Sequence, residues 1–180
     1  MVLCYIANGF EEIEALMPVD CIRRCEKEVL LVGVGGMIIK GSHGITVFAD
    51  IEDSENIDFS KVEMIILPGG MPGTLNLEKS KQVNDAIDYC VANNIPIAAI
   101  CAAPSILGHK GILNGKKAVC YKGFEDQLVG AEVLMTPVCK DGNIITARGM
   151  GVSDLFSYEI IKTLISKEKA DRLFVNIIKE

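Results

Sequence analysis

Short apolar runs along the chain predict the strands of a parallel sheet. Each run is nearly continuous, as expected of strands that helices cover on both faces. Four such runs lie at residues 2–7, 28–34, 62–67 and 95–100. Two weaker apolar stretches, at residues 118–121 and 143–147, predict further strands.

Helical periodicity follows or separates these runs. Apolar side chains recur at intervals of three and four residues between 83 and 91 and again between 170 and 178. Residues 152–165 predict another helix, and Ser80 and Ser166 are suited to cap helix N-termini. Because strands and helices alternate, we expect an α/β/α sandwich with a mostly parallel central sheet.

Residues 37–50, MIIKGSHGITVFAD, have a different pattern. Two apolar stretches flank a Gly-Ser-His-Gly turn, which predicts a β-hairpin. No repeat, linker or low-complexity tract interrupts the sequence. We therefore expect residues 1–180 to form a single domain.

Charge and hydropathy exclude several classes of function. The net charge is −6 and the basic residues are dispersed, which argues against nucleic acid as a partner. No apolar run is long enough to cross a bilayer, so no membrane partner is expected. Since the N-terminal segment lacks a basic leader, we expect a cytoplasmic protein.

Seven cysteines are present, an odd number without metal-site spacing. Neither a disulfide scaffold nor a metal site is predicted. Cys4, Cys90 and Cys120 lie in apolar segments, which favours a place in the core, whereas Cys21 and Cys25 are expected to be thiols one helical turn apart. The GVGG stretch at 33–36 has no helical pattern directly after it, so no nucleotide cofactor is expected.

Cys101 stands at the junction between the 95–100 strand and a predicted helix that begins near Ala102 or Ala103. A nucleophile at such a turn is held out of the sheet, and Pro104 suits the first turn of the helix. The helix N-terminus should favour the thiolate and lower the thiol pKa below its free value of roughly 8.5. A buried structural cysteine is an equally good interpretation of the position alone.

Glycines and acids follow other predicted strands, so they are expected to lie at the same edge of the sheet as Cys101. In PGGMPG at 68–73, the Gly70 amide could form an oxyanion hole with the Ala102 amide, although such a cluster is also typical of a plain turn. Glu11 and Glu12 fit the first turn of a helix, where the dipole favours acids. Glu14 lies further in among apolar residues, so it is expected to keep its proton longer than an exposed glutamate. A protonated Glu14 could donate a hydrogen bond to the Cys101 sulfur and exchange protons with a substrate.

Only two histidines exist, His43 and His109. His109 is two helical turns from Cys101, and His43 lies on the hairpin turn. The chain therefore shows no papain-like Cys-His pair, unless His43 folds back or comes from a second subunit.

Four segments together resemble the ThiJ/PfpI superfamily, and most closely its parkinsonism-associated deglycase branch. They are FEEIEALMPVD (10–20), ILPGGMPG (66–73), AAICAAPSILG (98–108) and ITARGMG (145–151). The resemblance covers residues 2–165. It implies a flavodoxin-like fold, a homodimer, a reactive Cys101, a conserved Glu14 and oxyanion amides at Gly70 and Ala102.

The same resemblance outlines a wider pocket that includes Gly69, His43, Tyr121 and Gly149. Tyr121 stands where some members have a histidine, and His43 stands where some have an arginine that reaches the partner subunit's site. Ala102 stands where the protease branch has a histidine, and no histidine follows His109, where amidotransferases have one. Protease and glutaminase activities are thus poorly supported.

Two functions from different classes follow. The first is a cofactor-independent glyoxalase or deglycase, in which Cys101 attacks a small dicarbonyl or a glycated adduct and Glu14 moves the proton. The second is an oxidative-stress sensor or redox-regulated chaperone, in which Cys101 is oxidised to sulfinic acid without significant turnover.

Overall fold

The computed structural model describes residues 1–177, and its centre is one seven-stranded sheet. The strand order is β10-β11-β7-β6-β1-β2-β5, and all neighbours are parallel except β10 and β11. The bounds are β1 (Val2–Ala7), β2 (Val29–Val34), β5 (Ile51–Glu52), β6 (Met64–Leu67), β7 (Ile97–Ile100), β10 (Val138–Asp141) and β11 (Ile144–Ala147). The expected mostly parallel sheet is confirmed.

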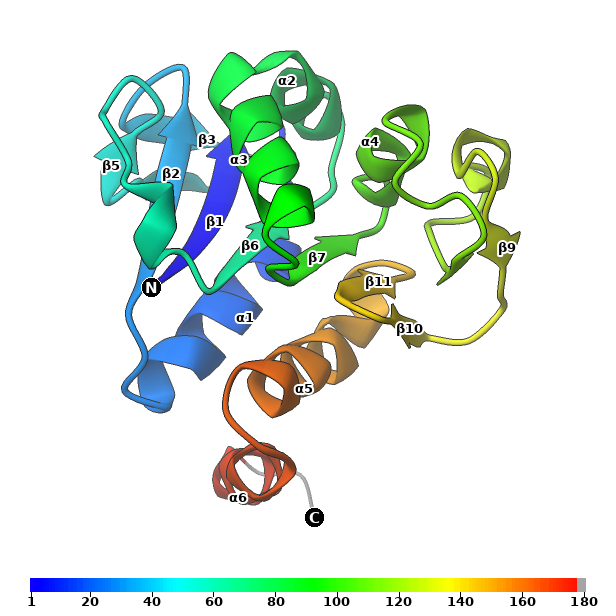
Figure 1. The fold of residues 1–180 in the computed structure, drawn as a ribbon. Helices are drawn as coiled ribbons and strands as arrows, with labels where there is room; N and C mark the ends of the chain where they lie inside the picture. The colour runs from blue at the N-terminus through cyan, green and yellow to red at the C-terminus, as the bar shows by residue number, and fades with distance from the viewer. Residues whose placement is uncertain (178–180) are drawn as a thin grey trace.

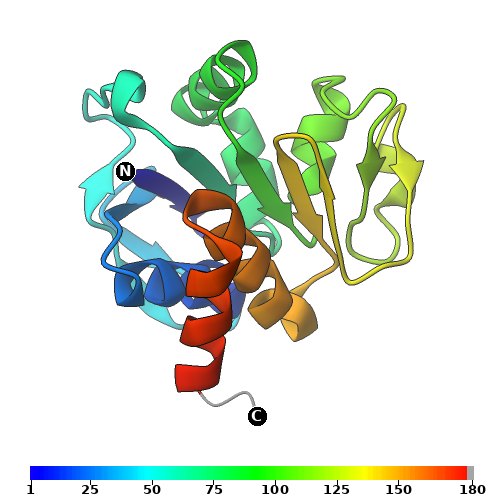
Figure 2. The same cartoon turned by 60° about the horizontal axis from the view of Figure 1, so that its bottom comes forward.

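Helices cover both faces of this sheet (Figures 1 and 2). One face carries α2 (Gly73–Lys79), α3 (Lys81–Ala92) and α4 (Pro104–His109). The other carries α1 (Glu12–Arg24), α5 (Ser153–Leu164) and α6 (Lys167–Asn176). The molecule is therefore the three-layer α/β/α sandwich that the alternation of apolar runs predicts.

Successive residues of β1 supply the two halves of the core. Cys4 and Ile6 belong to the cluster that contains α1 and α5, whereas Leu3 and Tyr5 belong to the cluster that contains α3 and α4. Side chains alternate across a strand, so a strand between two helical layers must be apolar at every position. All six residues of β1 are buried, which explains its unbroken apolar run.

The β-hairpin lies beside the main sheet. Its strands β3 (Ile38–Lys40) and β4 (Thr46–Phe48) pair antiparallel across the Gly-Ser-His-Gly turn, as predicted. The predicted strand at 118–121 is wrong in extent, because β8 covers only Lys117–Ala118 and pairs with β9 (Glu132–Val133). Beyond Ala118 the backbone leaves this pairing, and the Val119 amide donates to the Thr146 hydroxyl at 3.0 Å.

The predicted caps are confirmed. The Ser80 hydroxyl accepts a hydrogen bond from the Val83 amide at 3.4 Å, and the Ser166 hydroxyl accepts one from the Lys169 amide at 3.2 Å. Of the apolar positions that predicted α3, Val91 is exposed. Ile178, part of the pattern that predicted α6, lies outside the described residues.

Within residues 1–177, no helix combines the length and the apolar character needed to cross a membrane.

Tyr5 gives a test of the core. Its side chain is fully buried, and its hydroxyl has no hydrogen-bond partner among residues 1–177. Because an unpaired buried hydroxyl is costly, Tyr5→Phe should raise the free energy of unfolding by about 1 kcal/mol. Urea denaturation at neutral pH measures this change.

The matched control is Tyr158→Phe. The Tyr158 hydroxyl donates to Asp171 at 2.6 Å, so its removal should lower the free energy of unfolding and not raise it. Loss of stability in both variants would contradict an unpaired Tyr5 hydroxyl.

Candidate active site

Four parallel strands end at one edge of the sheet and place the candidate residues there. The segments that follow β1, β6, β7 and β11 contain, respectively, Glu14, Gly69, Cys101 and Gly149. The Cys101 amide donates to the Ala147 carbonyl at 2.9 Å, which ties the end of β7 to the end of β11. Ligands of open parallel sheets bind at this edge, where the strand order reverses about β1 and β6.

Cys101 occupies a sharp turn between β7 and α4. Its backbone φ is +65°, a left-handed conformation that is costly for a residue with a side chain. Its side chain is partly exposed, whereas the other six cysteines are buried. The turn therefore holds this one sulfur out of the core, as the predicted nucleophile elbow requires.

Two backbone amides point at the Cys101 sulfur. The amides of Gly70 and Ala102 both hydrogen-bond to it and favour its negative charge. Gly70 has a φ of +88°, a conformation that glycine adopts freely. These are the two amides expected to form an oxyanion hole, and here they lie at the atom that would attack a carbonyl.

Glu14 lies buried on the first turn of α1, with only 1% of its surface exposed. The Glu11 side chain caps α1 and accepts from the Glu14 amide at 2.8 Å, which holds the turn in place. The Glu14 carboxyl accepts from the Gly69 amide at 2.9 Å and also from the Met150 amide. It shares a further hydrogen bond with the Cys101 thiol.

Burial raises the pKa of Glu14 from 4.5 to about 7, and the charge of Glu11 adds to the rise. The hydrogen bonds from Cys101, Gly69 and Met150 oppose it. Glu14 thus keeps its proton far longer than an exposed glutamate, as predicted.

The predicted low pKa of Cys101 is corrected. Burial first, and then the charge of Glu14, raise the pKa of the thiol to about 12, and the amides of Gly70 and Ala102 only partly oppose this. With Glu14 protonated, the repulsion is absent, so the thiol and the carboxyl titrate as one coupled pair.

Gly69 permits the close approach of this pair. A Cβ at this position would lie 2.5 Å from the Cys101 Cβ and 2.7 Å from Glu14 Oε2. Atoms cannot come that close, so any side chain at 69 would force the thiol and the carboxyl apart. The structure therefore brings Gly69 into the site as predicted.

Tyr121 and Gly149 also lie at the site. The Tyr121 amide donates to the Cys101 carbonyl at 2.8 Å. A Cβ at Gly149 would lie 3.2 Å from the Tyr121 ring and 3.7 Å from Glu14 Oε1. Both predicted pocket residues thus border the thiol-carboxyl pair.

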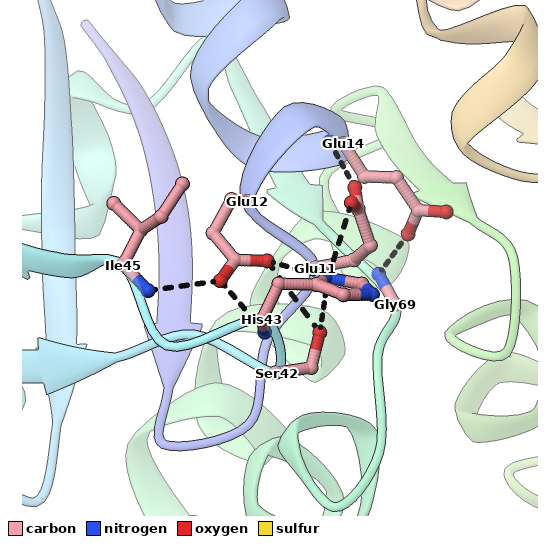
Figure 3. A network of polar contacts seen from close by, with 7 residues as sticks. All are labelled: Glu11, Glu12, Glu14, Ser42, His43, Ile45 and Gly69. Carbon is pink, nitrogen blue, oxygen red and sulfur yellow. Dashed lines mark hydrogen bonds and ion pairs between the residues drawn. The ribbon is translucent and has the colours of Figure 1, made fainter.

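His43 does not reach Cys101. Its Nδ1 lies 3.0 Å from Glu12 Oε2 and 3.9 Å from Glu11 Oε1, on the hairpin turn. Figure 3 shows Glu12 directed towards this turn and Glu14 towards Gly69. Among the described residues neither histidine contacts the sulfur, because His109 pairs with Glu78 on α2.

Glu12 has a role that its position in a first helical turn does not suggest. Its buried carboxylate accepts from the amides of His43 at 2.8 Å and Ile45 at 3.3 Å (Figure 3). Burial opposes its charge, but the bonds from the His43 side chain and from these amides outweigh burial and hold the pKa of Glu12 below 4.5. Glu12 therefore fastens the hairpin to α1.

Glu11, Glu12 and His43 also offer a cluster of ligand atoms within 4.8 Å of one another. The Glu12 carboxylate already serves two amides of the hairpin turn, which accounts for its position. We therefore assign no metal to this cluster.

Met150 is the site residue that the sequence interpretation does not include. Its amide bonds to Glu14 from the loop after β11. The apolar run at 143–147 could have indicated this residue, because a parallel strand there ends at the same edge of the sheet as the other three strands and Met150 follows it.

The pKa of Glu14 predicts how stability changes with pH. A carboxyl with a raised folded pKa binds its proton more tightly in the folded state, so stability falls as pH rises from about 4.5 to about 7. Glu14→Gln removes this titration. Between pH 5 and pH 8, the stability of the variant relative to wild type should therefore rise by about 2.5 kcal/mol in urea denaturation.

Glu12→Gln serves as the control. Because the pKa of Glu12 is lowered, this group is ionised in both the folded and the unfolded chain over most of the same pH range. Its variant should differ from wild type by a nearly constant amount between pH 5 and pH 8. A constant difference for Glu14→Gln as well would show that Glu14 titrates as an ordinary carboxyl.

Relatives of the chain are found among curated proteins. It is 33% identical to protein dj-1beta of Drosophila melanogaster over 174 residues, which cover 95% of this chain and 92% of the relative. It is 36% identical to DJ-1 homolog B of Arabidopsis thaliana over 172 residues, covering 94% of this chain but only 39% of that longer protein. A Pyrococcus abyssi protein named as a deglycase is 31% identical over 169 residues, with 91% and 98% covered.

Solved structures share the fold. Drosophila melanogaster DJ-1beta superposes with a TM-score of 0.91 at 32% identity, covering 98% of this chain and 96% of that one. Oxidised DJ-1 of Toxoplasma gondii superposes with a TM-score of 0.92 at 32% identity and the same coverage. The model of the DJ-1/PfpI family matches residues 1–163. The chain therefore belongs to the DJ-1/PfpI family.

Proposed function

We propose that the protein is a cofactor-independent glyoxalase or deglycase whose reactive groups are Cys101 and Glu14. One observation carries the proposal: a partly exposed thiol in a strained turn shares a hydrogen bond with a buried carboxyl. A nucleophile and a proton carrier in contact are what this chemistry needs. Two archaeal relatives bear the name deglycase.

The reaction begins from the form in which Glu14 holds the proton and Cys101 holds the charge. The sulfur of Cys101 bonds to the aldehyde carbon of methylglyoxal or glyoxal, and the carbonyl oxygen takes the proton of Glu14 to give a hemithioacetal. Glu14 is then a carboxylate that can accept the proton on that carbon, and the hydroxyl of the hemithioacetal passes its proton to the neighbouring carbonyl oxygen. Glu14 then moves the proton of that carbon to the neighbouring carbon. The first carbon is oxidised to a thioester and the second is reduced to an alcohol. Water cleaves the thioester, which releases lactate or glycolate and the thiol.

The amides of Gly70 and Ala102 stabilise the oxygen that becomes negative in this sequence. They already lie at the sulfur, so an oxygen on the carbon bonded to that sulfur falls within their reach. On glycated adducts, Cys101 would attack the carbon that is bonded to the modified amine or thiol. The amine or thiol would leave, and the carbonyl-derived fragment would remain on the sulfur. Protease and glutaminase chemistry is not supported, because no histidine among the described residues contacts Cys101.

Two variants test the enzyme proposal. Cys101→Ser should reduce the turnover of methylglyoxal by at least about a hundredfold, because an alcohol is a far weaker nucleophile here. Glu14→Gln should reduce it by about 10²- to 10⁴-fold while the protein stays folded, because the amide cannot carry the proton. Lactate formation measures both, with circular dichroism as the check on folding. Wild-type rates in Cys101→Ser would end the proposal.

A second function is favoured by the accessibility of this one thiol. Cys101 is the partly exposed cysteine, and a protonated Glu14 could donate a hydrogen bond to a sulfinic acid formed on it. The Toxoplasma gondii relative has been solved as the oxidised protein. In this alternative the protein is an oxidative-stress sensor or redox-regulated chaperone without significant turnover.

Mild peroxide separates the two functions. Mass spectrometry should find two added oxygens on Cys101 before any other cysteine, because the other six are buried. Selective oxidation together with an undetectable glyoxalase rate would favour the sensor. Equal oxidation of several cysteines would contradict the special environment of Cys101.

The remaining expectations stay predictions. Residues 1–180 are proposed to form one domain, and a cytoplasmic location fits seven cysteines that all remain free thiols. A homodimer fits the exposed apolar pair Ile38 and Phe48, which are cross-strand neighbours on the hairpin. A second copy of the chain would cover that surface.

A further inference from the structure

A groove of about 470 Å³ borders the reactive pair, and its ligand is unassigned. It is lined by Tyr121, Lys122 and Pro137 and by the segment from Arg148 to Val152. We call it the Tyr121 groove.

The Tyr121 groove meets the catalytic carboxyl directly. Met150 lines the groove, and its amide donates to Glu14. Gly149 lines it too, and a Cβ there would lie 3.7 Å from Glu14 Oε1. A molecule whose carbonyl is bonded to Cys101 could therefore extend its remaining part into this groove.

The charge of the groove is opposite to that of the chain. Lys122 and Arg148 are its charged lining residues, and no acidic side chain lines it. The chain as a whole has 24 acidic and 18 basic residues. Lys122 is exposed and Arg148 is partly exposed, and neither belongs to a salt bridge found within residues 1–177.

A helix begins at the end of the groove. Helix α5 begins at Ser153, directly after the lining residue Val152, and no side chain caps its first amides. The buried Ser153 hydroxyl also has no hydrogen-bond partner among the described residues. The start of a 12-residue helix carries a partial positive charge, but the acidic Asp154 lies in its first turn and offsets it. The positive character of the groove therefore rests on Lys122 and Arg148.

We propose that the Tyr121 groove binds the negatively charged part of the substrate, which is an aldehyde or 2-oxoaldehyde carrying a carboxylate or a phosphate. The groove makes the natural substrate an acidic carbonyl compound, and neutral methylglyoxal is then a poor analogue. The catalytic half of this inference rests on the proposed function, whereas the anion site rests on the groove itself.

Alkylation of Cys101 tests the anion site without any turnover. Iodoacetate and iodoacetamide both form a carbon-sulfur bond and release iodide, and they differ mainly in charge. We divide the rate of Cys101 alkylation by iodoacetate by the rate of its alkylation by iodoacetamide. This ratio should fall about three- to fivefold in Lys122→Gln and in Arg148→Gln, as expected for the loss of a partly exposed charge. Lys79→Gln, which removes a lysine of α2 outside the groove, should leave the ratio unchanged.

Unchanged ratios in Lys122→Gln and Arg148→Gln would overturn the anion site. Lys122 is exposed, so its variant remains informative even if Arg148→Gln fails to fold. Thermal unfolding of each variant checks this point.

Turnover distinguishes this inference from the proposed function. We expect kcat/KM to be higher for 4,5-dioxopentanoate or for 3-phosphooxy-2-oxopropanal than for methylglyoxal, and Arg148→Gln should remove the difference. The better of the two acids identifies carboxylate or phosphate. Equal turnover of acidic and neutral compounds would refute the anion site in the Tyr121 groove but not the proposed enzyme activity. A fall in the alkylation ratio of the variants without any turnover by the wild type would refute the enzyme activity but not the anion site.

Discussion

The hydrogen bond between the Glu14 carboxyl and the Cys101 thiol is the interaction on which the site depends. A charged carboxyl keeps the proton on sulfur, whereas a protonated carboxyl frees the sulfur to be charged. In the proposed reaction, the location of this one proton decides whether Cys101 can attack a carbonyl. Burial of Glu14 makes this proton available near neutral pH.

The fold maintains this pair at a cost in stability. A buried carboxylate is unfavourable, and the amides of Gly69 and Met150 only partly compensate. Cys101 adds a strained backbone. The fold tolerates the buried carboxyl of Glu14 and the strained backbone of Cys101 because the strands beneath them are buried on both faces. Gly69 also leaves room at a position where any side chain would collide with the pair. The geometry of the thiol-carboxyl pair is thus supported by a core that is largely apolar.

Much of this arrangement could be predicted from the sequence because its signals are local. Strand β1 is apolar at every position, the caps at Ser80 and Ser166 are serines, and the hairpin has a glycine-flanked turn. These features depend on neighbours in the chain. Cys101 and Glu14 could be identified because each follows a strand, and parallel strands end together.

Other features could not be predicted because they depend on distant contacts. The backbone after Ala118 bonds to Thr146 and Cys101 instead of extending a strand. Glu12 accepts hydrogen bonds from the amides of the hairpin turn, which lies far from it in the sequence. The predicted direction of the Cys101 pKa shift is wrong, since burial and the charge of Glu14 together exceed the effect of the Gly70 and Ala102 amides.

The distribution of the seven thiols means that their accessibility reports whether the protein is folded. Six sulfurs are shielded by packing alone, while one meets solvent. A reagent that counts reactive thiols would find one in the intact protein and more only after layers of the sandwich separate. The number of thiols that react therefore measures how far the protein has unfolded, whatever reaction Cys101 itself undergoes.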